Sequence, residues 1–284
     1  MSSRLGPWLP RWDLTLDGPP PKVRYQGLSD PGEVAFVRRG ETQLVLKLLP
    51  DHGDEARMGA VLAHWDGRGA VRLIAEAPGA ILMERARPGD DLAELRERVG
   101  DTEATRVACD VMAALNRPPL ADAEDFRTIA DWGRAFERDR ELAIAVGFDA
   151  GLIDEAAAVF AELLATQAEP VLLHGDLHHR NVLRDAERGW LAIDPKGVLG
   201  EPAYETGALL RNPNDLPAYC ADEGVIARRA RQICERLGYE RRRVLGWAFS
   251  QWVLACLWAA EDGIAFEPSW LDGPSAARRL YLSA

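Results

Sequence analysis

The sequence lacks the surplus of basic residues that would mark a nucleic-acid-binding protein. Its 284 residues include 34 lysines and arginines against 45 acidic residues, for a formal net charge of −11. Because binding along a nucleic-acid backbone requires a basic surface, this balance argues against that class of protein. With 47% hydrophobic and 28% charged residues, the composition is otherwise that of an ordinary globular chain.

Cysteines and long apolar segments are also few. The four cysteines lie far apart, without the paired spacing of zinc ligands, and we expect them to be free thiols in a reducing cytoplasm. The first residues contain no apolar core of a signal peptide. The longest apolar segment, 244–260, includes Ser250 and Gln251 and is marginal for crossing a membrane, so we expect a buried helix there.

The predicted elements change in type once along the chain. Residues 1–21 show no clear periodicity. Short alternating or apolar segments then predict strands at 22–28, 33–38, 42–49, 71–74 and 80–83, with a helix at 54–65. Later helices are expected at 90–99, 101–116, 124–146, 152–167, 203–211, 222–237, 240–262 and 275–282. We therefore predict an α+β fold of two lobes, a small β-rich lobe of residues 1–87 and a larger, mostly helical lobe of residues 88–284.

A polar segment between two short apolar runs carries the clearest chemical signal. It reads His-Gly-Asp-Leu-His-His-Arg-Asn from 174 to 181, and a further apolar run at 190–193 ends in Asp194. Phosphoryl transfer needs a carboxylate that accepts the proton of the attacking hydroxyl, and oxygen ligands that hold magnesium on the phosphates. Asp176, Asn181 and Asp194 supply this set at the spacing of kinase catalytic segments. A surface hairpin with scattered polar residues is the alternative, which the coupled spacing disfavours. We expect all three side chains to emerge from one small β unit.

A lysine in the first lobe fits the same chemistry. Lys47 lies in an otherwise apolar strand, where a buried ammonium group is costly unless it has anionic partners. Glu55, in the first turn of the following helix, is the expected partner, together with the phosphates of a nucleotide. The alternative is that Lys47 lies on an edge strand and reaches solvent. We would favour this alternative if the chain lacked the segment at 174–194.

The remaining nucleotide contacts have weaker sequence signals. A Gly-rich G-x-G-x-x-G loop is absent, and the turn at 27–32, with Ser29, occupies the place where a phosphate-covering loop is expected. The segment after the last strand of the small lobe is the expected hinge, where main-chain groups would edge the base. Its candidate residues are Met83, Glu84 and Ala86.

Taken together, residues from about 40 to 262 resemble the aminoglycoside phosphotransferases, which share the protein-kinase-like fold. They are similar in particular to the branch that contains streptomycin 6-kinase and hydroxyurea phosphotransferase. The resemblance rests on residues 45–47, 82–85, 174–178, 181–183, 192–197, 200–205 and 209–213.

The resemblance implies a role for each matching residue. Asp176 corresponds to the catalytic base, Asn181 and Asp194 to the magnesium ligands, and Lys47 to the phosphate-binding lysine. Glu205 stands where relatives carry an acid, usually Asp, that braces the catalytic loop. The implied phosphoryl donor is ATP or GTP, and the implied cofactor is Mg²⁺.

The acceptor is expected to be a small, cationic molecule. Between Asp194 and Glu205 there is little room for the activation segment or peptide platform of a protein kinase, and no A-P-E sequence follows. Residues 101–170 contain 15 acids against 6 basic residues, which could attract an aminoglycoside such as streptomycin. Candidate acceptor-binding residues are Glu201, Glu205, Glu261 and Asp262, and further acids that could face the cleft are Asp131, Glu137, Glu141 and Glu267.

Two other functions stay open at this point. One keeps the chemistry and replaces the acceptor by a metabolite, a sugar, amine or amino alcohol. The other is a kinase-like binding module without catalysis, which the intact catalytic set disfavours. We expect a monomer or weak dimer, with no nucleic-acid or membrane partner.

Overall fold

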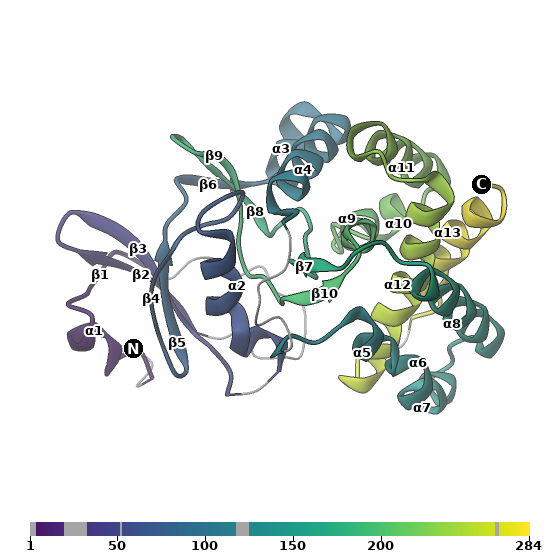
Figure 1. Ribbon diagram of the computed structural model, residues 1–284, viewed down its shortest axis with the longest axis horizontal. Coiled ribbons are helices and arrows are strands. Elements are labelled where there is room, and N and C mark those ends of the chain that lie inside the picture. The colour runs from purple at the N-terminus through teal and green to yellow at the C-terminus, as the bar shows by residue number, and fades with distance from the viewer. Residues whose placement is uncertain (1–3, 20–32, 52, 118–124, 265–266) are drawn as a thin grey trace.

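The computed structural model describes residues 4–19, 33–51, 53–117, 125–264 and 267–284. The chain folds into a β-rich lobe and a helical lobe that lie side by side (Figure 1). The predicted two-lobed α+β fold is therefore confirmed. The first lobe contains α1 (Trp8–Arg11), β1 (Thr15–Leu16), β2 (Val34–Arg39), β3 (Thr42–Leu48), the 3-10 turn η1 (Asp54–Arg57), α2 (Met58–Trp65), β4 (Leu73–Ala77) and β5 (Ala80–Glu84).

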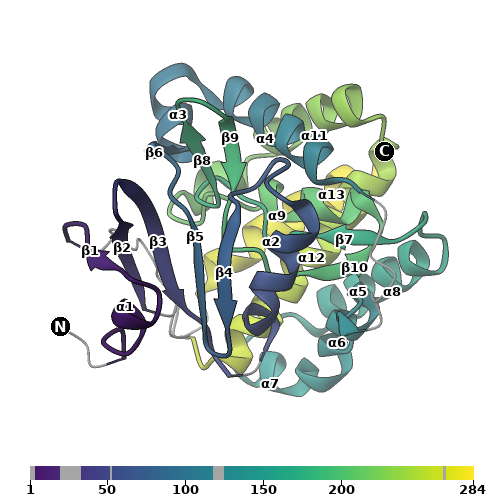
Figure 2. The same ribbon diagram turned by 60° about the vertical axis from the view of Figure 1, so that its left-hand side comes forward.

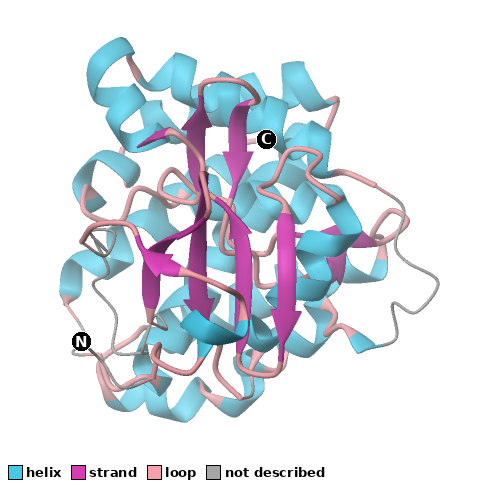
Figure 3. Cartoon of the chain, turned by 90° about the vertical axis from the view of Figure 1, so that its left-hand side faces the viewer, coloured by secondary structure: helices cyan, strands magenta, loops and turns pink. Residues whose placement is uncertain are grey.

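The small lobe is built on one five-stranded antiparallel sheet, with strand order β1-β2-β3-β5-β4 (Figure 3). The strand predicted at 22–28 lies outside the described residues. The edge strand β1 comes instead from the segment 1–21, whose sequence shows no clear periodicity, and pairs Thr15 with Arg38. A two-residue strand depends on its neighbour for pairing and is too short to show a period.

Alternation along β3 directs its side chains to two different faces of this sheet. Leu44, Leu46 and Leu48 are buried in a small outer core that α1 covers. Val45 packs on the main core, which lies on the inner face of the sheet. Lys47 is two residues further along β3 and therefore lies on the same face. The period of two therefore places the lysine toward α2 and the helical lobe.

The large lobe holds the rest of the chain. Its helices and turns are α3 (Leu92–Val99), α4 (Asp101–Leu115), α5 (Ile129–Gly133), α6 (Ala135–Arg138), α7 (Arg140–Ala145), α8 (Ala150–Ala165), η3 (Pro202–Glu205), α9 (Thr206–Leu210), α10 (Pro217–Cys220), α11 (Glu223–Leu237), α12 (Arg241–Glu261), η4 (Pro268–Leu271) and α13 (Asp272–Leu282). Its strands are β6 (Pro88–Asp91), β7 (Val171–Leu173), β8 (Val182–Asp185), β9 (Gly189–Ala192) and β10 (Val198–Gly200).

The helix α12 is the centre of this lobe, packed by α7, α8, α9 and α13 (Figures 1 and 2). The residues predicted to form a buried helix do so, and Ser250 satisfies its hydroxyl on the carbonyl of Gly246. Among the described residues, the helices are too short or too polar to cross a membrane. The single helix predicted at 124–146 is wrong, because α5, α6 and α7 break it into three short helices. The first of them begins at a capping box in which Thr128 and Asp131 bond each other's backbone N–H.

The sequence suggested that the segment 171–194 forms one β unit, and this prediction is wrong. β7 pairs with β10, whereas β8 pairs with β6 and β9. The loop from 174 to 181 therefore crosses between two small sheets. Its geometry depends on contacts from both.

A buried ion pair ties α4 to α11 beneath this loop. The guanidinium of Arg229 is fully buried and donates to both carboxylate oxygens of Asp101, at 2.6 to 3.2 Å. It also donates to the carbonyl of Asn212 at 2.6 Å. Burial alone would raise the pKa of Asp101, but the hydrogen bonds from Arg229 and Arg228 lower it to about 2.

We predict that Asp101→Ala lowers the free energy of unfolding by about 3–5 kcal/mol, because Arg229 would stay buried without a counter-charge. Since the folded-state pKa of Asp101 lies below its ordinary value, this stabilisation is present at neutral pH and fades as pH falls from about 4 toward 2. Denaturant unfolding at neutral pH and near pH 3 measures both effects. Asp110→Ala, on the exposed face of α4, is the matched control and should cost at most about 1 kcal/mol. Equal losses for the two variants would contradict the prediction.

Candidate active site

The backbone of the loop after β7 is held by one buried carboxylate. Glu205 accepts hydrogen bonds from the backbone N–H groups of His174 at 2.6 Å, of Gly175 at 3.1 Å and of Leu177 at 3.3 Å. Burial raises the pKa of Glu205 to about 7, although these three donors favour the ionised form. The carboxylate is thus fully engaged by the loop. Its candidate role in acceptor binding is wrong, and the geometry is that of a brace.

His174 is a packed residue of the same loop. Its Nε2–H donates to the carbonyl of Ile193 at 2.7 Å, and its Nδ1 accepts from the backbone N–H of Asp176 at 3.2 Å. The ring stacks on Trp65, with centroids 6.1 Å apart. Complete burial lowers the pKa of His174 to about 4, so the imidazole is neutral and fixes the direction of the loop.

Asp176, at the turn of this loop, lies between a guanidinium group and an imidazole ring. Arg211 Nη2 lies 3.3 Å from its Oδ1, and His178 Nε2 lies 3.8 Å from its Oδ2. Burial would raise the pKa of Asp176, but His178, Arg211 and Lys196 outweigh that effect and lower it. The carboxylate is therefore ionised at neutral pH, the state in which it can accept a proton.

Asn181 stands immediately before β8, and Asp194 lies two residues after the end of β9. The Nδ2 of Asn181 donates to the backbone carbonyl of Asp176 at 2.9 Å, which orients the amide. Asp194 adopts φ of +55°, an uncommon left-handed backbone for a residue other than glycine. Such strain is found at functional sites.

The expected ion pair between Lys47 and Glu55 is not present, and this prediction is corrected. Lys47 Nζ lies 3.1 Å from Asp194 Oδ1, with a lysine side chain only 4% exposed. Glu55 instead pairs with Lys196, two residues after Asp194. Both lysines thus bridge the two lobes, and each holds a carboxylate of the opposite lobe.

The donor set suits magnesium bound together with a nucleotide. Among the described residues no group of three or more His, Cys, Asp and Glu side chains forms a ready-made metal site. One carboxylate and one amide oxygen, from Asp194 and Asn181, are what Mg²⁺ takes when phosphates and waters complete its coordination. The residues therefore fit the ion.

The predicted nucleotide contacts outside this centre fall in three places. Met83 and Ala86 are buried where β5 leaves the sheet. The backbone N–H of Glu84 donates to the carbonyl of Arg72 at 2.9 Å, and its carboxylate pairs with Arg188 of the large lobe, so both groups are engaged within the protein. Ser29 lies outside the described residues.

The candidate acceptor acids behave differently from one another. Glu201 is 1% exposed and binds Arg243 and the indole N–H of Trp247, so the prediction that it contacts the acceptor is wrong. Glu261 and Asp262 are exposed at the end of α12, and Glu261 pairs with Arg138 at 2.6 Å.

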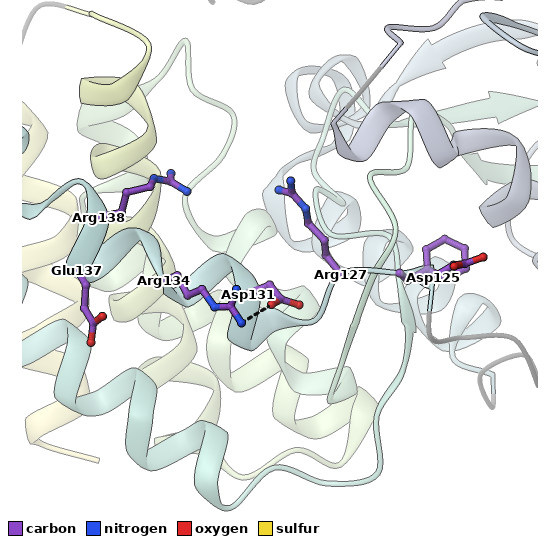
Figure 4. A pocket seen from close by; sticks show the side chains of 7 residues that line it. Asp125, Arg127, Asp131, Arg134, Glu137 and Arg138 are labelled. Carbon is purple, nitrogen blue, oxygen red and sulfur yellow. Dashed lines mark ion pairs between the residues drawn. The ribbon is translucent and has the colours of Figure 1, made fainter.

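A hollow on the large lobe, over α5 and α6, contains two of the other candidate acids (Figure 4). Asp131 and Glu137 line it, but arginines alternate with them, and Arg134 lies 3.1 Å from Asp131. The hollow lies beside the segment that follows Asp194, because a Cβ added at Gly197 would lie 3.3 Å from the ring of Phe126, which lines it. Its residues are Asp125, Phe126, Arg127, Asp131, Arg134, Glu137 and Arg138.

Two side chains of the centre were not assigned from the sequence. Arg211 belongs to the 209–213 segment that carries the family resemblance, yet its contact with Asp176 spans 35 residues and has no local signal. Lys196 stands two residues after Asp194 in Asp-Pro-Lys-Gly, and that position was the available hint.

An ionised carboxylate on a braced loop, an orienting asparagine, a second acid and a buried lysine define a phosphotransferase centre of the protein-kinase type. The model of the aminoglycoside/hydroxyurea antibiotic resistance kinase family matches residues 11–263, and the chain belongs to this family. It is a small-molecule phosphotransferase. The family predicted from the sequence is thus confirmed.

Named relatives agree with this assignment. A streptomycin 3''-kinase of Klebsiella pneumoniae is 36% identical over 80% of this chain and 84% of its own length. A streptomycin 6-kinase of Streptomyces glaucescens is 31% identical over 90% of this chain and 82% of its own. The fold is also that of a thermostable mutant of the aminoglycoside phosphotransferase APH(4)-Ia in complex with ADP and hygromycin B, with a TM-score of 0.61 at 14% identity, over 100% of this chain and 99% of that one.

Proposed function

We propose that this phosphotransferase moves the γ-phosphate of ATP to a hydroxyl group of streptomycin or a close aminoglycoside, and so inactivates the antibiotic. The observation that carries the proposal is that Lys47, Asp176, Asn181 and Asp194 meet at one centre in a chain 36% identical to a streptomycin kinase. A binding module without catalysis would not need all four. We assign the nucleotide to residues 1–87 and the acceptor to residues 88–284.

Asp176 is the proposed general base. Because Arg211 occupies its Oδ1, we assign Oδ2 as the atom that accepts the proton of the acceptor hydroxyl. The acceptor oxygen then forms a bond to the γ-phosphorus, and the bond from that phosphorus to the bridging oxygen of ADP breaks. Glu205 and His174 keep the carboxylate in position throughout, through the backbone of the loop.

Asp194 and Asn181 are the proposed ligands of Mg²⁺, and Lys47 the proposed phosphate contact. When bound, the ion would neutralise phosphate charge and orient the chain of phosphates. A carboxylate that ligates a cation no longer needs Lys47 as its counter-charge. The lysine, already buried and cationic in the cleft, is then available to bind phosphate.

The acceptor is proposed to enter beside the hollow on α5 and α6. Its lining residue Phe126 lies beside Gly197, three residues after Asp194, and its mixed charges suit a sugar that carries both hydroxyl and cationic groups. The alternating arginines mean that the acid surplus of this segment is partly neutralised on this surface.

The test is an ADP-release assay with streptomycin, hydroxyurea, and a panel of sugars and amino alcohols. We expect streptomycin to stimulate ADP release and to gain the mass of one phosphoryl group, with NMR giving the hydroxyl that is modified. Controls without acceptor measure idle ATP hydrolysis. Phosphorylation of hydroxyurea or of a metabolite, with streptomycin untouched, would replace the proposed acceptor and keep the chemistry.

A further inference from the structure

We propose that Lys196 is a second phosphate-binding cation, which contacts the γ-phosphoryl group during its transfer. This inference rests on the proposed function, because it requires a nucleoside triphosphate in the cleft. It assigns to Lys196 a role distinct from that of Lys47. The argument starts from how few lysines the chain has.

Lysine is rare in this protein, and its placement is uneven. Lys22, Lys47 and Lys196 are the only lysines, whereas the chain has 31 arginines. Two of the three reach the centre that contains Asp194. A lysine differs from an arginine as a compact point charge on a flexible stem, suited to a phosphate that moves during reaction. The selective use of lysine here therefore points to phosphate contact rather than to a structural ion pair, for which this chain uses arginine elsewhere.

The backbone of Lys196 is fixed against the catalytic loop. Its N–H donates to the carbonyl of His174 at 2.8 Å, and the N–H of Gly197 donates to the same oxygen at 3.2 Å. A Cβ added at Gly175 would lie 3.4 Å from the Cβ of Lys196. The side chain of Lys196 thus starts beside Gly175, the residue before the proposed base. Asp194 lies two residues before Lys196 in the chain.

The ion pair with Glu55 does not close off the ammonium group of Lys196. Its Nζ contacts Glu55 directly, while about a third of the side chain, 32%, stays exposed to the cleft. A cation carried beside the catalytic loop, two residues after the proposed magnesium ligand Asp194, can stabilise negative charge on the transferred group.

The present partner of Lys196 can be exchanged. Glu55 is the residue that the sequence pattern pairs with Lys47, and in this structure Lys47 is engaged by Asp194 instead. If Asp194 turns to Mg²⁺ when nucleotide binds, Lys47 and Glu55 can pair, and this releases Lys196 to phosphate. The turn carrying Glu55 is already docked on the large lobe.

Two contacts of the neighbouring Asp54 hold that turn in place. Asp54 accepts from the indole N–H of Trp132 at 3.1 Å and lies 3.5 Å from Arg127. Since these contacts do not involve either lysine, they can persist through the exchange. Glu55 therefore stays within reach of the centre in both states.

Calorimetric titration of ATP and of ADP, with Mg²⁺ and without acceptor, tests the proposal. Lys196→Met should weaken ATP binding about tenfold or more, the scale of a lost hydrogen bond to a charged group, and leave ADP binding within about twofold. Lys47→Met should weaken both nucleotides. Glu55→Gln is the matched control, because it breaks the same ion pair and keeps the cation, so the ratio of ATP to ADP affinity should not fall. Lys196→Arg should recover part of that ratio.

The outcomes separate the possible failures. The proposal would be overturned if Lys196→Met weakened ATP and ADP binding equally. It would also be overturned if Glu55→Gln lowered the ratio of ATP to ADP affinity as much as Lys196→Met does. In either case Lys196 would be only a link between the lobes. A parent protein that binds neither nucleotide would instead overturn the proposed function. Melting temperatures of the variants show whether each is folded.

Discussion

Asp176→Asn should lower the turnover number by about two or more orders of magnitude, the scale of a lost general base, while ATP affinity stays close to that of the parent. The amide matches the carboxylate in shape but cannot take up the proton of the acceptor hydroxyl. Asn181 and His174 bond the backbone of residue 176 rather than its side chain, so the loop should keep its geometry. Initial rates at saturating acceptor, together with ATP titration, measure the two quantities.

A matched control separates this effect from a general loss of charge near the loop. Asp215 pairs with Arg180 of the same loop at 2.7 Å and is partly exposed. Asp215→Asn should therefore change turnover only a few-fold, by about the energy of an exposed ion pair. If Asp176→Asn turns over like the parent, or no worse than Asp215→Asn, then Asp176 is not the base.

The second large effect concerns magnesium. Asp194→Asn should reduce nucleotide affinity about tenfold or more when Mg²⁺ is present, because a charged ligand of the ion is lost. Without Mg²⁺ the affinity should hold or rise, since Lys47 loses the carboxylate 3.1 Å away that competes with phosphate. Asparagine tolerates the φ of +55° at this position better than alanine does, so it isolates the charge.

Nucleotide titrations with Mg²⁺ and with a chelator make this comparison. Asn181→Ala should act in the same direction but more weakly, as expected for a neutral ligand that also orients the loop. Equal losses of affinity in both conditions would indicate a damaged fold instead of a lost ligand. Turnover should fall in parallel with the Mg²⁺-dependent affinity.

Local sequence patterns were sufficient for much of the centre. The period of two in β3 placed Lys47 on the inner face, and the spacing of Asp176, Asn181 and Asp194 corresponded to three side chains at one centre. The strands and helices with clear periodicity were also predicted close to their positions, as in α11 and α12. These features depend on neighbours a few residues away, so a single sequence contains them.

Other features had no local signal. Strand β1 forms only because β2 offers an edge, and the break of 124–146 into three helices follows how they pack against α8. β7 and β8 were expected in one unit, yet each found a different partner strand. Pairing of this kind depends on which segments the fold brings together, and hydrophobic patterns do not specify the partner.

The sequence by itself determined the class of fold, the family and the residues of the catalytic loop, because periodicity and motif spacing are properties of short segments. Only the tertiary structure decided which charges meet. It placed Lys47 on Asp194, Lys196 on Glu55 and Arg211 on Asp176. It also turned Glu201 inward to Arg243, away from any acceptor. These pairs join residues that lie from 35 to 147 positions apart. Such pairs form because folding brings the two charges close together in a partly buried environment, where their attraction is strong.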